Sequence, residues 1–527
     1  MMIHKLKTRF ILFYLISVTV SLYSRSSVNV PINHWVYHFL DRLQTRKVIQ
    51  TAVYQSRPYS RQEVANMLTE VQKKLDKDQN ILSATEMAWF EQLKGEFFEE
   101  LDLQKIPADS TLYERHLIRW DEGPHRIRAD LDINEMLVFN SGDQYPETEH
   151  ISRTSLGGII RGQIKKSFSY YLFTHNTFIK GQDIAEETFN PSQGPPITIS
   201  GDNVVSDDAE AYIKWQVPWF EIEFGRDRIQ WGPGYRGNLM LSADNPRFEL
   251  LKMKVQSKHF QFTHFHGKLH SGLGAKYLVA HRLEVRLFSW LSLAGSEAVI
   301  YGNRSPDPMY LIPLMPFHVA EHHLGDLDNN TMGFDFTLYP RAGHRFYFEL
   351  FLDDFSTSEN PFTFYGNKFA FLSGWRWAAP FNLKDLDLVI EYARIEPFVY
   401  THTREINVYK NYDRPIGHWL GQNGDGVYIR TNYLFHRNFH AALIIERFRR
   451  GEGDINTPHT AEMGTRKQFL SGTVETDQCF GIELKWQFLR DMFAQLNYTF
   501  QNIDNPARLS DTHANDHSIK IEMRVNY

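Results

Sequence analysis

The end of the chain carries a pattern that few folds can accommodate. From Ile519 to Tyr527 the odd-numbered residues are apolar or aromatic, whereas the even-numbered ones are polar or charged. A final strand with one apolar face, one polar face and a terminal aromatic residue is typical of outer-membrane β-barrels, whose walls separate lipid from water. The same alternation recurs upstream, in residues 127–133, 211–217, 346–352, 480–488 and 494–500.

The segments between these runs alternate in length, which is a second barrel feature. Outer-membrane barrels join their strands by short turns on the periplasmic side and by longer loops outside. Reading back from the C-terminus, long segments alternate with short ones: 502–517, 489–492, 449–472, 436–438, 401–425, 378–384, 356–367 and 341–344. By the same parity, residues 302–330 form an external loop, whereas no strands can be assigned between Phe224 and Ala275. We predict an all-β transmembrane antiparallel barrel at residues 110–527, with about 18 strands (range roughly 16–20).

The N-terminal region differs in character from this barrel. Residues 1–24 read as an export signal, with Lys5, Lys7 and Arg9 ahead of an apolar run that is too short for a probable spanning helix. From 28 to 105 the apolar residues follow a helical period. Ser60 with Glu63, and Ser83 with Glu86, have the spacing of capping boxes. We therefore expect a small helical segment, placed in the periplasm, before the barrel.

Composition excludes several classes of protein. The 57 basic and 63 acidic residues give a net charge of −6, which argues against a nucleic-acid-binding protein. The single cysteine, Cys479, excludes an intramolecular disulfide. A soluble β-sandwich or propeller remains the alternative fold, but the terminal aromatic, the loop asymmetry and the signal together favour the barrel. The sequence predicts no cofactor, and a monomer is compatible with it.

One segment goes beyond ordinary barrel sequence. Residues 225–250 read GRDRIQWGPGYRGNLMLSADNPRFEL. This segment resembles the capsule assembly protein Wzi family in its Gly-Arg, Trp-Gly-Pro-Gly and Leu-x-Leu-Ser-x-x-Asn-x-Pro elements. Further similar blocks are AHRLEV at 280–285, SEAVIYG at 296–302, GDLDNN at 325–330 and GHWLGQNGD at 417–425. The resemblance implies a barrel of about 18 strands behind a short helical part, and a non-enzymatic, lectin-like role in anchoring or assembling a capsule.

Glycan binding needs flat apolar faces together with convergent polar groups. Aromatic and arginine side chains near the family-like blocks have this mixture, and arginines can grip a sugar carboxylate through two hydrogen bonds. The candidates are Arg226, Trp231, Tyr235, Arg236, Arg282, Tyr301, Trp419 and Asp425. The alternative is structural: the charges pair with one another inside the lumen, and Trp231 belongs to a packed plug shaped by the adjacent glycines and proline.

Two other functions compete with glycan binding. The sequence HVAEH at 318–322 has the His-x-x-Glu-His pattern of inverted zinc proteases, with His323 and Asp326 beside it. It lies in a loop with Pro313 and Pro316 and lacks an evident third ligand, so we predict no enzyme and leave open whether His318, His322 and His323 bind a metal. An outer-membrane porin is the alternative function, because it would share the fold and differ only in an open lumen.

Taken together, these features predict an exported protein of the bacterial outer membrane. Its helical segment would lie in the periplasm and its long loops outside the cell. Its partners would be capsular or other surface polysaccharide and the outer-membrane lipid.

Overall fold

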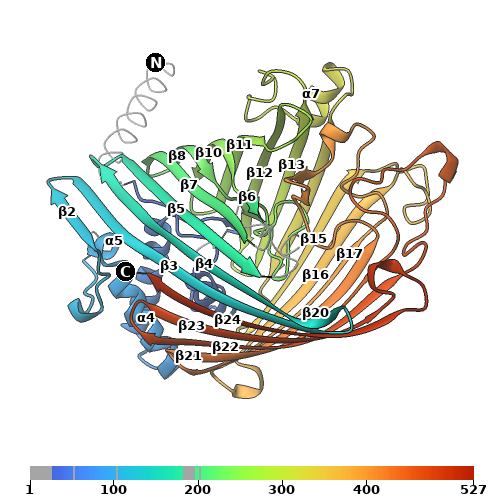
Figure 1. Cartoon of the computed structure of the whole chain (residues 1–527). Helices are drawn as coiled ribbons and strands as arrows, with labels where there is room; N and C mark the ends of the chain where they lie inside the picture. The colour runs from blue at the N-terminus through green and yellow to red at the C-terminus, as the bar shows by residue number, and fades with distance from the viewer. Residues whose placement is uncertain (1–25, 51–53, 103–104, 182–195, 201–202, 527) are drawn as a thin grey trace, which may run out of the picture.

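The computed structural model describes residues 26–50, 54–102, 105–181, 196–200 and 203–526. Within these residues the chain forms a closed antiparallel barrel with a cluster of helices at one end (Figure 1). The predicted export signal, residues 1–24, lies outside the described part of the chain. No helix in that part is long and apolar enough to cross a membrane.

The barrel wall contains eighteen strands, counted over the described residues, which confirms the predicted fold class. In chain order they are β3 (His125–Gly142), β4 (Tyr145–Ile164), β5 (Phe168–Gly181), β7 (Asn203–Val217), β8 (Phe220–Asp227), β10 (Phe248–Gln256), β11 (Phe260–Leu269), β12 (Lys276–Phe288), β13 (Leu291–Gly302), β14 (Asn329–Leu338), β15 (His344–Asp354), β16 (Lys368–Ala378), β17 (Leu386–Ile395), β20 (Gly424–His436), β21 (Phe439–Arg450), β22 (Glu475–Leu489), β23 (Met492–Asp504) and β24 (His513–Asn526). The seam is the antiparallel pairing of β24 with β3, in which Val525 lies opposite Ile133.

Shorter elements complete the fold. The remaining strands are β1 (Ser56–Arg57), β2 (Ile118–Glu122), β6 (Pro196–Ser200), β9 (Gln230–Trp231), β18 (Lys410–Asn411) and β19 (Arg414–Pro415). The helices are α2 (Val36–Thr45), α3 (Arg61–Leu75), α4 (Ala84–Glu96), α5 (Phe98–Asp102), α7 (Phe317–His323) and the 3₁₀ turns η2 (Ser110–Leu112), η3 (Pro380–Asn382), η4 (Glu405–Asn407), η5 (Ala461–Met463) and η6 (Pro506–Arg508).

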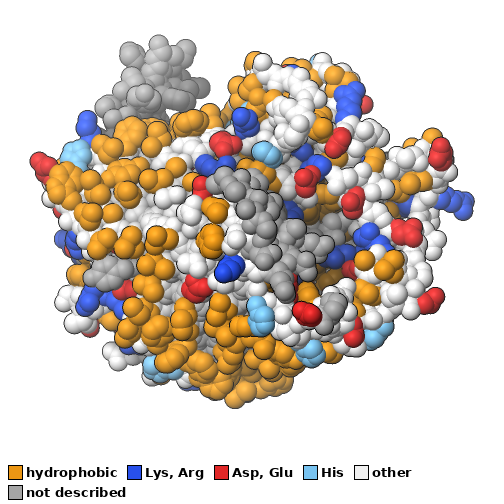
Figure 2. Space-filling model, viewed as in Figure 1, with side chains coloured by type: hydrophobic (Ala, Val, Ile, Leu, Met, Phe, Trp, Pro, Cys, Tyr) orange, Lys and Arg blue, Asp and Glu red, His pale blue; other side chains and the backbone are white. Residues whose placement is uncertain are grey.

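The outer face of the wall is apolar because every second side chain of each strand points outward. Along β24, Ile519, Ile521 and Met523 are all more than a third exposed. Along β21, Leu443 and Ile445 are about half exposed, at 51% and 53%. Figure 2 shows such side chains gathered in a broad surface at the left and bottom of the view. An exposed apolar surface of this extent is what a membrane-spanning barrel presents to lipid.

One predicted loop is shorter in the structure. The sequence places a polar loop at 502–517, whereas β23 extends to Asp504 and β24 begins at His513. The polar side chains at these strand ends bond across the ladder: Asn502 donates its Nδ2 to Asn515 Oδ1 at 2.9 Å. Strands can therefore continue in polar sequence beyond the apolar surface.

The unassigned region between Phe224 and Ala275 contains the end of β8 and all of β9, β10 and β11. Its period is lost because residues 228–247, which we call the plug loop, leave the wall and fold into the lumen. There β9 pairs with β1 of the N-terminal segment, and Ser56 lies opposite Trp231. A stretch that packs on all sides has no reason to alternate.

The N-terminal helices form their own apolar core and dock on the short-turn end of the barrel. Both predicted capping boxes are present, at Ser60 with Glu63 and at Ser83 with Glu86. The Gly343 N–H donates to the carbonyl of Thr45 at 2.8 Å, which joins α2 to the β14–β15 turn. The indole N–H of Trp89 donates to the carbonyl of Arg437 at 2.8 Å, which joins α4 to the β20–β21 turn.

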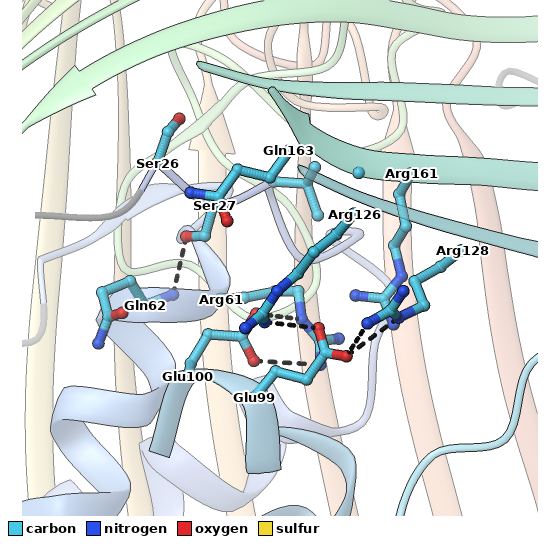
Figure 3. A pocket seen from close by; sticks show the side chains of 12 residues that line it. Ser26, Ser27, Arg61, Gln62, Glu99, Glu100, Arg126, Arg128, Arg161 and Gln163 are labelled. Atoms are coloured by element: carbon cyan, nitrogen blue, oxygen red, sulfur yellow. Dashed lines mark hydrogen bonds and ion pairs between the residues drawn. The ribbon is translucent and has the colours of Figure 1, made fainter. Parts of the chain in front are cut away.

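A cluster of ion pairs fixes α3 and α5 to the inner side of β3 and β4 (Figure 3). Glu99 lies between two arginines of β3, accepting from Arg128 Nε at 3.0 Å and from Arg126 Nη1 at 3.2 Å. Arg61 of α3 donates its Nε to Glu100 at 2.9 Å. The space that remains among these side chains measures about 50 Å³, so this cluster is a packed contact with little room for a ligand.

A buried ion-pair group anchors α2 to the wall. The Arg42 guanidinium contacts Glu86 Oε1 at 2.8 Å and also the Asp387 carboxylate of β17, and all three side chains are fully buried. Removing one member of a buried pair costs roughly 3–5 kcal/mol. For Arg42→Met we expect the low end of this range, because Arg46 and Arg376 still contact the two carboxylates.

We predict that Arg42→Met loosens the helices while the barrel stays folded. Hydrogen exchange of residues 36–96 should increase at least tenfold, while the wall strands keep their protection and the protein keeps its compact migration on unheated gels. Arg119→Met is the control, because Arg119, which pairs with Asp121 at 3.1 Å and with Glu99 at 3.7 Å, is 45% exposed, and ion pairs of such exposed side chains contribute little. Unchanged helix protection in Arg42→Met would contradict the prediction.

Candidate functional site

The lumen is filled around the plug loop and a second inward segment, residues 396–423, which we call the return loop. Tyr400 of the return loop donates its hydroxyl to the carbonyl of Leu239 at 2.7 Å, and Tyr409 donates to the carbonyl of Met240 at 2.9 Å. The Ser242 N–H donates to the carbonyl of Ile416 at 3.0 Å. The two loops therefore fold as one packed body, and its core also contains wall side chains such as Phe351 and Leu372.

Three glutamates on wall strands hold this body and the adjacent N-terminal segment in place, and we call Glu284, Glu349 and Glu391 the wall carboxylates. Glu349 on β15 accepts from Gly234 N, Asn238 Nδ2 and Leu239 N, each at 2.8 Å. Because all three carboxylates are buried, they replace water as acceptors for the loop backbone.

The other two wall carboxylates act in the same way on neighbouring segments. Glu391 on β17 accepts from Tyr235 N at 2.6 Å and from Arg236 N at 2.9 Å. Glu284 on β12 accepts from Gln55 N at 2.7 Å, next to β1. The plug loop and the N-terminal segment are thus bonded to three different sectors of the wall.

Gly232 and Gly234 are required by this arrangement. A Cβ on Gly232 would lie 2.5 Å from Glu349 Oε1, and one on Gly234 would lie 2.0 Å from the carbonyl oxygen of Gly237. Gly232 also has φ +119°, which side chains disfavour. The Trp-Gly-Pro-Gly sequence therefore lets the backbone approach the wall closely.

The predicted site residues separate into three groups. Trp231 lies in the core of the plug with 1% exposure, packed edge-on against Phe265 at 5.4 Å. Arg282 lies in the lumen wall at the N-terminal segment, where it is buried and paired with Asp335 at 2.5 Å. Both side chains are therefore buried and in contact with other residues of the protein.

Arg226, Tyr301 and Asp425 lie on the outer side of the wall, so the structural alternative, in which the charges pair inside the lumen, does not describe Arg226 and Asp425. The strand parity decides this: they share a face with the exposed Phe224, Leu293 and Val427 respectively. Each has a neighbour that covers it there. Arg226 contacts Glu249 at 2.7 Å, Asp425 accepts from Arg449 Nη2 at 2.6 Å, and the Tyr301 ring lies 5.1 Å from that of Tyr310.

The remaining candidates, Tyr235, Arg236 and Trp419, come together on the surface of the plug body. The Arg236 guanidinium lies 4.3 Å from the centre of the Trp419 ring and donates its Nε to Glu446 at 3.0 Å. Tyr235 stacks against Tyr428 of β20, with ring centres 6.0 Å apart. Sequence reasoning missed Tyr428.

Arg450, at the end of β21, is a second residue that the sequence analysis missed. Its guanidinium lies 5.5 Å from the centre of the Trp419 ring, so that two arginines flank one indole. Tyr428 and Arg450 both occupy the inward parity of their strands, which is the signal that would have found them. We call Tyr235, Arg236, Trp419, Tyr428 and Arg450 the arginine shelf.

In each ion pair of the shelf, the arginine is more exposed to solvent than its carboxylate partner. Arg236 is 34% exposed and its partner Glu446 11%, and Arg450 is 30% exposed and its partner Glu475 16%. His418 lies under the shelf, and burial, followed by the charges of Arg236 and Arg450, lowers its pKa to about 3. The imidazole is therefore neutral at physiological pH, and the shelf's positive charge comes from its arginines.

A separate chamber of about 280 Å³ lies in the lumen beside the plug, between residues 29–33 and strands β3, β4, β5, β7, β8 and β24. Its charged side chains pair with one another. Arg524 contacts Asp132 at 3.0 Å, and Arg247 contacts Glu210 at 2.7 Å. The charges of the chamber named here are thus paired within the protein, as those of the shelf are.

The HVAEH motif forms α7 in the loop between β13 and β14. The rings of His318 and His322 are 4.3 Å apart, while Glu321 is buried. Within the described residues, no group of three or more His, Cys, Asp or Glu side chains is arranged to hold a metal ion.

The model of the family described as capsule assembly protein Wzi matches residues 160–518, more than half of the chain. The chain belongs to this family. The predicted family membership is therefore confirmed, and no curated protein sequence matches at a significant level.

Solved structures support the same fold for this Wzi-family chain. The Escherichia coli outer-membrane protein Wzi, whose structure is described as a carbohydrate-binding β-barrel involved in group 1 capsule assembly, aligns with a TM-score of 0.61 at 15% identity, over 95% of this chain and 99% of that one. Acinetobacter baumannii OccAB1 aligns at 0.46 and 8% identity, over 76% of this chain and 96% of its own, and a BenF-like porin from Pseudomonas fluorescens at 0.45 and 8%, over 76% and 99%. The last two scores are too low to bear on function.

We predict that the protein is silent in planar bilayers and that Glu349→Ala/Glu391→Ala produces ion-conducting steps. Losing Glu349 alone leaves three donors without their acceptor, at about 1–3 kcal/mol each, so the plug loop should detach transiently. Single-channel recording measures this. Glu249→Ala is the control, because Glu249 is 56% exposed and outside the lumen. Stable steps from the unmodified protein would show an open pore and contradict the prediction.

The loop carrying α7 should respond to pH. Burial, followed by Asp326 and Asp328, raises the pKa of Glu321 from 4.5 to about 8. The folded loop therefore keeps a proton on Glu321 that the opened loop releases. The free energy needed to open the loop thus falls as pH rises from about 4.5 to about 8, and it stays low above pH 8.

We expect hydrogen exchange of residues 303–328, corrected for intrinsic rate, to be faster at about pH 9 than at about pH 5. Glu321→Gln should remove most of this difference, whereas Glu359→Gln, an exposed glutamate of the next long loop, should not. Equal pH dependence in the two variants would refute the assignment to Glu321.

Proposed function

We propose that this chain binds a surface or capsular polysaccharide at the long-loop end of an outer-membrane barrel and helps to anchor or assemble a capsule, without chemical conversion of the glycan. The long loops would face the outside and the helices the periplasm. Membership in the Wzi family and the carbohydrate binding described for the Escherichia coli protein support this proposal.

The arginine shelf is the observation that carries the proposal. Two guanidinium groups, each about a third exposed, flank the Trp419 ring at the surface of a filled lumen. Guanidinium groups bind carboxylates through paired, charge-assisted hydrogen bonds, and Tyr235, at 36% exposure, adds an apolar face beside them. The shelf therefore suits a glycan that carries carboxylate groups, such as one containing uronic acids.

A porin is the competing function, and the plug body argues against it. The plug and return loops are bonded to each other, and the plug loop is bonded to β15 and β17 through Glu349 and Glu391. A diffusion pore would need a continuous water path through this body. The bilayer recording described above separates the two functions.

The binding test uses purified protein, a uronic-acid polysaccharide and the same polymer after chemical reduction of its carboxyl groups. We expect the acidic polymer to bind at least about tenfold more tightly, and Arg236→Gln and Arg450→Gln each to lose about tenfold, since a charge-assisted hydrogen bond contributes about 1.5–3 kcal/mol. Lys410→Gln is the control, because Lys410 is only 13% exposed and its partner Asp413 is 83% exposed, so this position presents a carboxylate rather than a cation to a ligand.

Equal binding of the two polymers would refute the role of the shelf arginines. Binding that survives in the Arg236→Gln/Arg450→Gln double variant would place the glycan site elsewhere, with the lumenal chamber as the next candidate.

A further inference from the structure

The outer face of the wall carries a basic group at the long-loop end of β17 and β21. In the strand register Arg394 lies opposite Asp425, and Asp425 lies opposite Arg449. Cross-strand partners point to the same side of a sheet, and Asp425 shares the outward parity of Val427. Arg394 and Arg449 therefore lie on the outside of the barrel, and so does Arg447, two residues along β21. We call Arg394, Arg447 and Arg449 the outer arginine group.

The register also shows what lies beside this group. The next row toward the short-turn end contains Tyr392, Val427 and Arg447. The row after that is wholly apolar and runs across five strands: Ile390, Ile429, Ile445, Phe480 and Phe500. The outer arginine group thus stands at the polar edge of the lipid-facing surface: along the strands, Arg447 is two residues from the apolar row, and Arg394 and Arg449 are each four residues from it.

In each of its ion pairs the arginine is the exposed member. Arg449 is 35% exposed above Asp425 at 8%, and Arg394 is 25% exposed beside Glu396 at 0%. Arg447 is exposed, and it forms no ion pair within the described part of the chain. The buried carboxylates orient the guanidinium groups of Arg394 and Arg449, so the exposed charge of these ion pairs is positive.

The guanidinium positions are fixed by packing. The Arg394 guanidinium lies 3.8 Å from the centre of the Phe469 ring, and the segment around Phe469 is held by Lys467, which contacts Glu396 at 3.1 Å. Arg449 forms two hydrogen bonds to Asp425, at 2.9 and 2.6 Å. A fixed pair of guanidinium groups loses little entropy when it binds an anion.

The opposite side of the barrel shows that this polarity is not general. Arg226 of β8 also faces outward at the long-loop end, next to the exposed Phe224 and Leu251. There the carboxylate is the exposed member: Glu249 is 56% exposed and Arg226 24%. The same residue types at the same edge of the apolar surface therefore present negative charge outward on β8 and β10, and positive charge on β17 and β21.

We propose that the outer arginine group binds the phosphate-bearing headgroup of an outer-leaflet lipid, whose acyl chains lie on the apolar row below. The proposal relies on the orientation given above, with the long loops outside, and is independent of glycan binding on the shelf. Guanidinium groups match phosphate oxygens in geometry and charge. An amphiphile with an anionic head is the ligand whose two parts fit both neighbouring surfaces.

The test is native mass spectrometry of the full-length protein in detergent, titrated with a bisphosphorylated glucosamine lipid or with its dephosphorylated form. We expect one bisphosphorylated lipid to be retained preferentially, with at least about tenfold weaker retention in Arg394→Gln/Arg447→Gln/Arg449→Gln. Arg226→Gln should retain lipid as the unmodified protein does. Arg447→Gln alone serves as a second variant, because it leaves no buried carboxylate without its partner, and it should weaken retention several-fold.

Equal retention of the two lipids, or undiminished retention in both the Arg447→Gln and the triple variants, would overturn the proposal. So would unchanged lipid retention combined with weaker polysaccharide binding in these variants, which would make the outer arginine group a glycan surface. Failure of the shelf test alone leaves this result unaffected, because the two sites lie on opposite sides of the wall.

Discussion

The structure depends on buried carboxylates that accept backbone hydrogen bonds inside the barrel. A loop that enters the lumen brings N–H groups with it, and each needs an acceptor once water is excluded. Glu349 and Glu391 provide acceptors for the plug loop, and Glu284 provides one for the segment before β1. The filled lumen, the position of the return loop and the arginine shelf all follow from these contacts.

Much of the fold could be predicted because a lipid-facing wall imposes a period of two on its sequence. The alternation at 346–352 and at 480–488 lies within β15 and β22, and the strand number was within the expected range. The plug loop could not be assigned, since its contacts are with wall residues such as Glu349, more than a hundred positions away. The local pattern of apolar and polar residues does not reveal partners that lie so far away in the sequence.

The positions of the candidate side chains were harder to predict than the strands, for a reason visible in the same alternation. Residue type and proximity to family-like blocks suggested Arg226, Tyr301 and Asp425, but strand parity places them on the outer face. Parity also indicates Arg450, which residue type alone did not. The residue type indicates which side chains can bind a ligand, whereas strand parity shows whether a side chain faces the lumen or the outside. Both are needed to predict a site in a barrel.

The pairing of β1 with β9 has a consequence for the order of assembly. Ser56 of β1 lies opposite Trp231 of the plug loop, and Arg42 of α2 contacts Asp387 of β17, so the N-terminal segment binds to parts of the chain that come much later in the sequence. Contacts of such sequence separation form slowly. The seam between β24 and β3 is made by the last strand of the chain. The N-terminal segment therefore completes its contacts only when β9 and β17 are in place, and the closed barrel encloses β1 together with the plug loop.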